Sequence, residues 1–256
     1  MAARLEDKTA LVTGATSNIG RAIAIAFATE GAHVAVSGRD EGRGAAVVAE
    51  IRAAGGRADF VPASLDGTPE ASMALATAAT EVLGGRIDVL VNNAGIYPPS
   101  TTTTTDEATF DRVFAVNVKA PFFLTAAIAP TMVEQGGGAI INLGSWIARL
   151  GIPVASLYSA TKGAVETLTR AWAAEFGPSG VRVNAISPGV VHTPDPAAPA
   201  EHPGEVMMHG TPHGSSGRPE AIAMAAVYLA SDEALFVHGT VIDVDGGRIG
   251  VAVIAG

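Results

Sequence analysis

The stretch "TALVTGATSNIGRAIA", residues 9–24, decides the fold of this chain. A short apolar run opens it, and an alanine-rich helical pattern follows Gly20. Gly14 allows a sharp turn after the apolar run, and Gly20 allows close packing between a helix and a strand. The amides of the first helical turn would then face an anion such as a pyrophosphate, which the helix dipole favours. A plain helix entry can carry the same glycines, but the preceding strand makes nucleotide binding the favoured interpretation.

Short apolar runs alternate with longer alanine-rich helical patterns along the whole chain. The apolar runs contain few polar residues, which is typical of a parallel sheet covered on both faces. Glycines end the helical patterns, and strand–helix–strand units of this kind build a doubly wound sheet. The sequence predicts strands at 9–14, 33–38, 58–63, 136–145, 181–189 and 240–247, and a strand that runs into a loop at 87–95. It predicts helices at 19–30, 41–54, 69–83, 106–117, 119–135, 155–176 and 219–231.

No linker or repeat divides the chain, so we expect a single α/β domain over residues 1–256, with helices on both faces of the sheet. The threonine-rich run 100–105 is interpreted as a surface loop, with Thr105 as the N-cap of the next helix. Segment 192–218 is rich in Pro, His and Gly and has no periodicity. A loop of that length in a compact domain is a functional lid or a disordered excursion, and here we expect it to be the substrate loop.

Composition limits the classes of partner. A net charge of −9 without any basic run argues against nucleic acid and anionic membranes. The absence of cysteine excludes disulfides and thiolate chemistry and fits a cytoplasmic protein. The N-terminus lacks the apolar core of a secretory signal, and no apolar run approaches the ~18 residues that a membrane span needs. We therefore expect a soluble, cytoplasmic protein.

Four histidines lie in the irregular segment, at positions 192, 202, 209 and 213. None has the i, i+4 helical spacing of a zinc protease, and no cysteine accompanies them, so we expect no bound metal. Arg149 is open to two readings, pairing with an anionic substrate or with a surface carboxylate.

The end of the second predicted strand bears on the choice of cofactor. A carboxylate there would accept hydrogen bonds from a ribose 2′-hydroxyl and repel a 2′-phosphate. This chain has "VSGRD" at 36–40, which places Gly38 in the acidic position and Arg39 after it. A guanidinium suits a phosphate, so NADP(H) is favoured over NAD(H). The alternative is that Arg39 is a solvated residue at a helix start, where Asp40 caps the helix.

Tyr158 and Lys162 lie in "LYSATKGAVETLTR", residues 157–170, within a helical pattern. Positions i and i+4 share one helix face, so the phenol and the ammonium can point into the same cavity. A phenol has a reference pKa of about 10, and a nearby cation stabilises the phenolate and lowers that value. The pair predicts a proton-transfer device, although a tyrosine and a lysine at this spacing are often only surface residues.

The order of several short motifs resembles the short-chain dehydrogenase/reductase family in its compact, single-domain form. The motifs are "TGATSNIG" (13–20), "NNAG" (92–95), Asn117, Ser145, "YSATK" (158–162), "PGVVHT" (188–193), "GRPE" (217–220) and "VDGG" (244–247). The similarity spans about Lys8 to Gly247, and the pattern is closest to β-ketoacyl carrier-protein reductases and sugar or steroid dehydrogenases. It implies a Rossmann-type sheet of seven parallel strands in the order 3-2-1-4-5-6-7.

The resemblance also implies roles for the residues that match. Tyr158 would be the acid/base for a carbonyl and a secondary alcohol, and Lys162 would lower its pKa and bind the nicotinamide ribose. Ser145 would orient the substrate carbonyl, and Asn117 would hold a water that relays protons. The substrate, a ketone or a 3-oxoacyl group, would contact Ser145, Trp146 and Tyr97. Cofactor contacts would come from Gly14, Thr16, Ser17, Asn18, Ile19, Gly20, Arg39, Ser64, Leu65, Asn92, Ala94, Gly95, Tyr158, Lys162, Pro188, Gly189, Val191 and Thr193.

Three positions depart from the family pattern. Asn18 replaces the middle glycine of the first motif, and asparagine tolerates positive φ better than most residues. Ser64 and Leu65 stand where an Asp and an apolar residue are common, and Ser17 adds no basic group to the phosphate loop. Two other functions stay open: an NAD-dependent sugar or steroid dehydrogenase, and a non-catalytic NADP(H)-sensing regulator. The family also implies a homotetramer or a homodimer.

Overall fold

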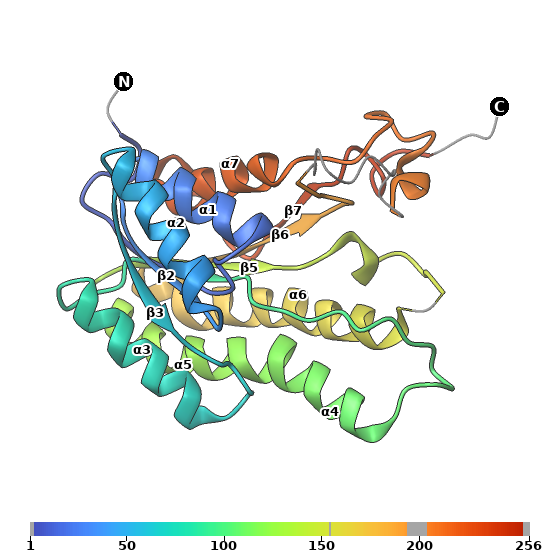
Figure 1. Ribbon diagram of the computed structural model, residues 1–256, viewed down its shortest axis with the longest axis horizontal. Coiled ribbons are helices and arrows are strands. Elements are labelled where there is room, and N and C mark those ends of the chain that lie inside the picture. The colour runs from blue at the N-terminus through green and yellow to red at the C-terminus, as the bar shows by residue number, and fades with distance from the viewer. Residues whose placement is uncertain (1–2, 154, 194–203, 253–256) are drawn as a thin grey trace.

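A seven-stranded parallel sheet forms the centre of the computed structural model, which describes residues 3–153, 155–193 and 204–252 (Figure 1). Its strand order is β3-β2-β1-β4-β5-β6-β7, with every adjacent pair parallel, so the predicted fold is confirmed. The strands are β1 (Thr9–Val12), β2 (His33–Gly38), β3 (Arg57–Pro62), β4 (Val89–Asn92), β5 (Gly138–Leu143), β6 (Val181–Pro188) and β7 (Val241–Val244).

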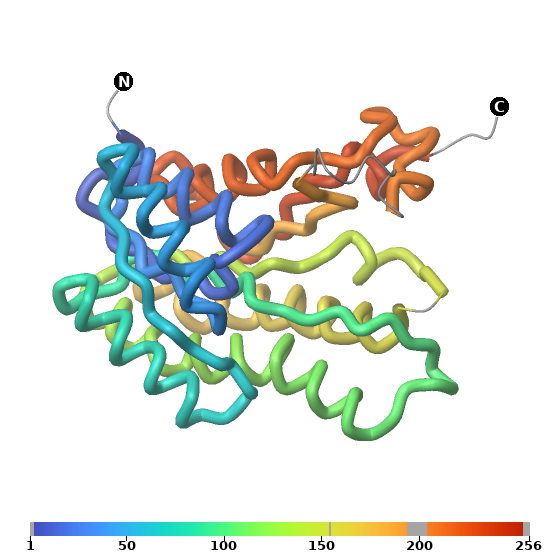
Figure 2. Tube along the Cα trace, viewed as in Figure 1, coloured from blue at the N-terminus to red at the C-terminus, as the bar shows by residue number. Residues whose placement is uncertain are grey.

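Helices cover both faces of the sheet, as the tube view also shows (Figure 2). Side chains alternate between the two faces of a strand. Ala10 and Val12 of β1 accordingly pack in the core under α1, α2 and α7, whereas Leu11 packs in the core under α3, α5 and α6. The helices are α1 (Asn18–Thr29), α2 (Glu41–Ala53), α3 (Pro69–Val82), α4 (Glu107–Phe114), α5 (Ala120–Glu134), α6 (Ser156–Phe176) and α7 (Pro219–Ala230).

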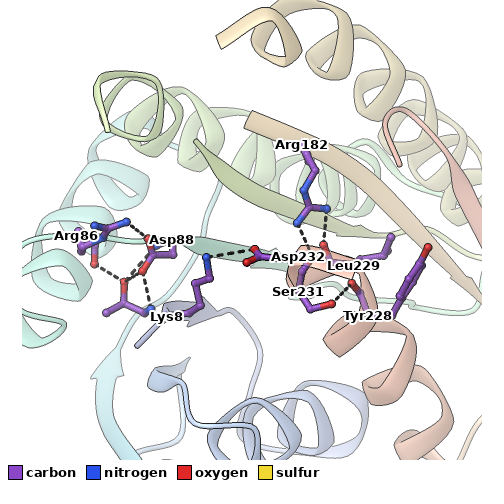
Figure 3. A network of polar contacts seen from close by, with 9 residues as sticks. Lys8, Arg86, Asp88, Arg182, Tyr228, Leu229, Ser231 and Asp232 are labelled. Carbon is purple, nitrogen blue, oxygen red and sulfur yellow. Dashed lines mark hydrogen bonds and ion pairs between the residues drawn. The ribbon is translucent and has the colours of Figure 1, made fainter. Parts of the chain in front are cut away.

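A buried arginine joins β6 to the end of α7 at the amino edge of the sheet, the edge where the strands begin (Figure 3). Arg182 Nη1 donates to the Leu229 carbonyl at 2.6 Å, and its Nη2 donates to the Ser231 carbonyl at 3.2 Å. These carbonyls close the C-terminus of α7, where the helix dipole is negative. The arginine therefore satisfies backbone groups that the helix itself leaves unpaired.

A second polar cluster at the same edge joins β1 to β4 (Figure 3). Asp88, which is buried, accepts hydrogen bonds from the Thr9 amide at 2.8 Å and the Thr9 hydroxyl at 2.9 Å. Arg86 pairs with the other oxygen of Asp88, and Lys8 lies 3.5 Å from Asp232 at the surface. Each charge of this cluster has a partner, so the cluster holds the first residues of β1 and β4 together.

One continuous helical segment replaces the two separate helices expected at 106–117 and 119–135. α4 runs into a π-helical turn at Ala115–Lys119 and then into α5. The predicted N-cap at Thr105 is wrong, because the Asp106 carboxylate accepts the capping bond from the Thr109 amide at 2.7 Å. Asn117 was expected at the junction of two helical stretches, and it lies in the π-helical turn that forms this junction.

The joined helix changes one expectation about hydropathy. Among the residues that the structure describes, one helix is long and apolar enough to pass the test for a membrane span: Glu107–Glu134 contains an 18-residue window with a mean hydropathy of 1.5. These apolar residues fall in two helices that the sequence predicted as separate elements. Since 44% of that window is buried and Leu124 and Met132 pack on the sheet, the segment is a core helix here.

Part of the irregular segment 192–218 has regular structure. A parallel bridge between Val191 and Gly217 closes its base, and Glu205–Met208 forms a 3₁₀ helix. Met208 is buried against Trp146 in a small apolar cluster. Residues 194–203 lie outside the described part of the chain.

Candidate active site

A cavity of about 450 Å³ opens at the carboxyl edge of the sheet, where the strands end. Parallel strands bring their C-terminal loops to one edge, and ligands of open α/β sheets bind there. The loops after β1, β2, β4, β5 and β6 all contribute to the cavity wall, and α6 adds two side chains, Tyr158 and Lys162. The sequence therefore brings segments that are far apart in the chain to one place.

The loop between β1 and α1 forms one end of the cavity. Gly14 has a φ of 63° and Asn18 a φ of 44°, so the expectation that asparagine takes the left-handed conformation is confirmed. Asn93 holds this loop, because its side-chain amide donates to the Thr13 carbonyl at 2.8 Å and the Gly14 carbonyl at 3.1 Å. Ser17 makes no capping bond with its side chain, so the first amides of α1 have no side-chain partner from this residue.

The end of β2 supplies a cation at the same end of the cavity. Arg39 lines the cavity and is exposed, and its guanidinium has no hydrogen-bond or ion-pair partner among the described residues. Asp40 caps α2 as expected: its carboxylate accepts from the Arg43 amide at 2.9 Å and from Arg43 Nε at 2.8 Å. These bonds lower the pKa of Asp40, so its negative charge is engaged by Arg43.

Tyr158 and Lys162 face each other at the opposite end of the cavity. Lys162 Nζ lies 5.6 Å from the centre of the Tyr158 ring, and it donates to the Leu143 carbonyl at 2.7 Å. Lys162 is 5% exposed, and burial lowers its pKa to about 8. The shared helix face predicted for the pair is confirmed.

The expected acidification of the Tyr158 phenol is wrong for this arrangement. Burial raises the pKa of Tyr158 to about 12, and a hydrogen bond with the Ser145 side chain opposes that rise. Tyr158 keeps some exposed surface on the cavity, but the surrounding protein replaces much of the water around its hydroxyl. Desolvation disfavours the phenolate, and here it outweighs the hydrogen bond with Ser145.

Asn117 supports the catalytic end from behind. Its Oδ1 accepts from the Ile96 amide at 2.8 Å, and its Nδ2 donates to the Ile96 carbonyl at 2.9 Å and to Thr161 Oγ1 at 3.2 Å. The π-helical turn thus joins the loop after β4 to α6. A Cβ added at Gly95 would lie 3.4 Å from Asn117 and 3.8 Å from Lys162, so Gly95 keeps this corner open.

The comparison with known proteins identifies the family. The family model described as enoyl-(acyl-carrier-protein) reductase matches residues 14–248. The chain belongs to the short-chain dehydrogenase/reductase family. It is therefore an oxidoreductase of that family, and the resemblance inferred from its motifs is confirmed.

Three relatives of this short-chain dehydrogenase/reductase illustrate the range of its similarity. The chain is 37% identical over 246 residues to a 3-oxoacyl-(acyl-carrier-protein) reductase of Thermotoga maritima, covering 96% of this chain and 99% of the relative. It is also 37% identical over 246 residues to a cyclopentanol dehydrogenase of Comamonas sp., covering 95% and 98%. A solved 7α-hydroxysteroid dehydrogenase, complexed with NADH and 7-oxo glycochenodeoxycholic acid, is 36% identical with a TM-score of 0.89, covering 96% of each chain.

Most of the predicted site residues of this short-chain dehydrogenase/reductase line the cavity, but five described ones lie outside its lining. Asn92 is buried and donates to Asn142 Oδ1 at 2.9 Å and to Thr125 Oγ1 at 3.3 Å. Trp146 packs in an apolar cluster. The other three are Ser64, Thr193 and Asn117, which supports the site from behind. The predicted residues that line it are Gly14, Thr16, Ser17, Asn18, Ile19, Gly20, Arg39, Leu65, Ala94, Gly95, Tyr97, Ser145, Tyr158, Lys162, Pro188, Gly189 and Val191.

Several lining residues were not predicted. Val116 and Leu143 border the catalytic end, and Asn93 borders the loop after β1. Each is a neighbour in sequence of a predicted residue, so a rule that extends each motif by one or two positions would have found them.

The open questions about Arg149 and the histidines have partial answers. Arg149 pairs with Asp243 through both Nη atoms and lies 3.6 Å from Glu166, so the carboxylate reading is the one that the structure supports. Within residues 3–153, 155–193 and 204–252, no group of three His, Cys, Asp or Glu side chains could hold a metal ion. His202 lies outside these ranges.

Proposed function

We propose that this protein is an NADP(H)-dependent oxidoreductase that interconverts a carbonyl and a secondary alcohol. The meeting of Ser145, Tyr158 and Lys162 on one wall of the cavity carries the proposal. A hydroxyl, a phenol and a buried cation together can bind a carbonyl oxygen and move a proton to it. The named activities of the acyl-carrier-protein reductase and the cyclopentanol dehydrogenase support the same reaction class.

The cavity fits a nicotinamide dinucleotide. Its lining includes Gly14, Gly20 and Gly189, where an added Cβ would meet protein atoms within 3.0 Å, so these glycines let the surrounding loops pack closely around the cavity. The start of α1 offers amides to a pyrophosphate. When bound, the nicotinamide supplies the hydride that reduces the carbonyl carbon. We propose that the predicted cofactor-binding residues that line the cavity contact the dinucleotide.

The protonation state of the catalytic groups favours carbonyl reduction. With a pKa of about 12, Tyr158 keeps its proton at neutral pH and can donate it to the carbonyl oxygen. Lys162, with a pKa of about 8, is mainly an ammonium at pH 7, and the Leu143 carbonyl fixes its position. Ser145 would bond the same carbonyl oxygen as Tyr158. Asn117 would position the loop after β4, and its proposed proton-relay water would have to use groups other than its engaged side-chain amide.

The preference for NADP(H) rests on the rim formed by Gly38 and Arg39. Gly38 provides no carboxylate for a ribose diol, and Arg39 provides an unpartnered cation, within the described part of the chain, for a 2′-phosphate. The alternative is an NAD-dependent sugar or steroid dehydrogenase. The NADH bound in the 7α-hydroxysteroid dehydrogenase structure favours that alternative, and a direct comparison of NADPH with NADH decides between them.

Substrate contacts are proposed for Tyr97, Ser145 and Trp146. The Tyr97 ring lies 4.7 Å from the Tyr158 ring, so a substrate held by Tyr158 would touch it. Trp146 would act from the apolar cluster behind Ser145. We further propose a cytoplasmic homotetramer or homodimer with one domain spanning residues 1–256, by analogy with the family.

The test compares the loss of the Tyr158 hydroxyl with the loss of a tyrosine hydroxyl outside the cavity lining. Tyr158→Phe should lower kcat with NADPH and a panel of ketones by about 10²- to 10⁴-fold, the range supplied by general acid catalysis. NADPH binding, measured by fluorescence titration, should change little. Tyr228→Phe removes a hydroxyl from α7, far from the cavity lining, and should leave kcat unchanged. Full turnover by Tyr158→Phe contradicts the mechanism. If the wild type turns over none of the ketones, the result favours the alternative hypothesis, a non-catalytic NADP(H)-sensing regulator.

A further inference from the structure

The glycine that ends β2 is required by space and not by its backbone. Gly38 has a φ outside the left-handed region, so its backbone conformation is open to any L-residue. A Cβ added at Gly38 would lie 2.6 Å from Thr16 Cγ2 and 3.3 Å from Thr16 Oγ1. Non-bonded carbon atoms pack at about 3.5–4.0 Å. Thr16 therefore occupies the position that any side chain at residue 38 needs.

Two features hold Thr16 in that position. The Ala15 amide donates to the Ser37 carbonyl at 2.8 Å, which ties the loop after β1 to the end of β2. Threonine is branched at Cβ and stiff in χ1, so its γ atoms do not move aside freely. Thr16 Cβ itself would lie 3.5 Å from the added Cβ. The obstruction therefore comes from the γ atoms, and alanine at residue 16 would remove it.

We propose that Thr16 is a specificity-determining residue that acts as a steric gate on position 38. A carboxylate that binds a ribose diol from the end of β2 needs a Cβ at residue 38, and Thr16 excludes it. Asp40 cannot take its place while its carboxylate accepts both bonds from Arg43. The Arg39 guanidinium then stands at the rim without a carboxylate that could bind the ribose diol. The loop proposed to bind the pyrophosphate therefore also favours a cofactor with a 2′-phosphate. This inference rests on the proposed preference for NADP(H).

The binding test compares Gly38→Asp, Thr16→Ala and the double variant by titration with NADPH and with NADH. Gly38→Asp alone should weaken binding of both cofactors, because the new side chain displaces the loop. Adding Thr16→Ala should tighten NADH binding by at least about tenfold relative to Gly38→Asp, within the 2- to 150-fold coupling usual for contacting residues. NADPH binding should stay weak because the carboxylate repels the phosphate. Equal NADH affinity of Gly38→Asp and the double variant overturns the gate.

A second test needs no cofactor and uses the smallest Cβ. Gly38→Ala should lower the Tm in the wild type and should lower it less, or raise it, in a Thr16→Ala background. Gly163→Ala is the matched control, because a Cβ at Gly163 in α6 meets nothing within 4 Å. It should raise the Tm equally in both backgrounds. Equal Tm shifts for Gly38→Ala in the two backgrounds overturn the gate.

The two tests separate the gate from the proposed cofactor. A wild type that binds NADPH more tightly than NADH, with no coupling between residues 16 and 38, contradicts the gate alone. A wild type that binds NADH more tightly contradicts the cofactor proposal, and with it the role of the gate, even where the Tm coupling is found.

Discussion

The two edges of the sheet differ in the partners of their charged side chains. At the amino edge, Arg182 donates to two backbone carbonyls and Asp88 accepts from Thr9 (Figure 3). At the carboxyl edge, Arg39 and Lys162 line the cavity with no carboxylate partner among the described residues. Parallel strands make the edges unequal, because helix N-termini and their amides gather at the carboxyl edge. The cations named at the amino edge are engaged by protein groups. At the carboxyl edge Arg43 pairs with Asp40, but Arg39 and Lys162, which is held by one backbone carbonyl, stay available for a ligand.

The largest expected effect comes from Lys162→Met. Removing a preorganised cation at a catalytic site costs on the order of 10²- to 10³-fold in kcat. The same change should stabilise the free protein at pH 7, because burial disfavours the Lys162 ammonium. Steady-state kinetics with NADPH and urea unfolding measure the two effects. Lys8→Met, at the amino edge, is the matched control; it should leave kcat unchanged and lower the free energy of unfolding by less than about 0.5 kcal/mol.

The stability gain of Lys162→Met should depend on pH. The pKa of Lys162 is about 8 in the folded protein and 10.5 for the free side chain, so between these values the unfolded chain binds more protons. Wild-type stability therefore rises with pH in this window as the penalty disappears. The pH-dependent part is on the order of 3 kcal/mol, present in full below pH 8 and absent above 10.5. A pH-independent gain would contradict the buried ammonium.

Arg182→Met at the amino edge should reverse the pattern of Lys162→Met. It leaves the Leu229 and Ser231 carbonyls without their donor, and losing hydrogen bonds to a buried charged group costs about 2–4 kcal/mol. For a domain of this size we expect the Tm to fall by about 5–15 °C. Turnover per folded molecule at low temperature should not change. A large loss of turnover without a fall in Tm would contradict the division of roles between the edges.

Sequence reasoning predicted the strands and the strand order better than their ends. The expected strand 136–145 is only Gly138–Leu143 in the structure, and 9–14 is only Thr9–Val12. The small residues that follow these strands belong to loops that face the cavity. Periodicity detects apolar residues, but it does not distinguish a strand from the loop that continues it.

The sequence predicted most residues of the candidate site, but it did not predict their burial or the pKa values that follow from burial. The i, i+4 spacing placed Tyr158 and Lys162 on one face, but sequence carries no measure of burial, and burial sets the pKa of Tyr158. The π-helical turn around Asn117 depends on a changed hydrogen-bond register that composition does not reveal. Asn92 matched its motif, yet a buried hydrogen bond to Asn142 uses its side chain.

Arg39→Ala sharpens the comparison at the carboxyl edge. Losing a charge-assisted bond to phosphate should raise the Kd for NADPH by about 10- to 100-fold, whereas the Kd for NADH should change by less than about twofold. The control is Arg52→Ala, which removes the same charge from a pair with Asp59 away from the cavity. Equal weakening of both cofactors by Arg39→Ala would reject its contact with the 2′-phosphate.

The smallest effect is expected for the exposed pair of Lys8 and Asp232, which lies beside the buried Arg182. The two atoms are 3.5 Å apart, and the side chains are 36% and 76% exposed. Water screens such a pair, so Lys8→Met should cost less than about 0.5 kcal/mol, or about 1–2 °C in Tm. Thermal unfolding at low and high salt measures it. A loss as large as that of Arg182→Met would mean that paired charge in general stabilises the amino edge; a small loss attributes that stability to the buried arginine and the carbonyls it satisfies.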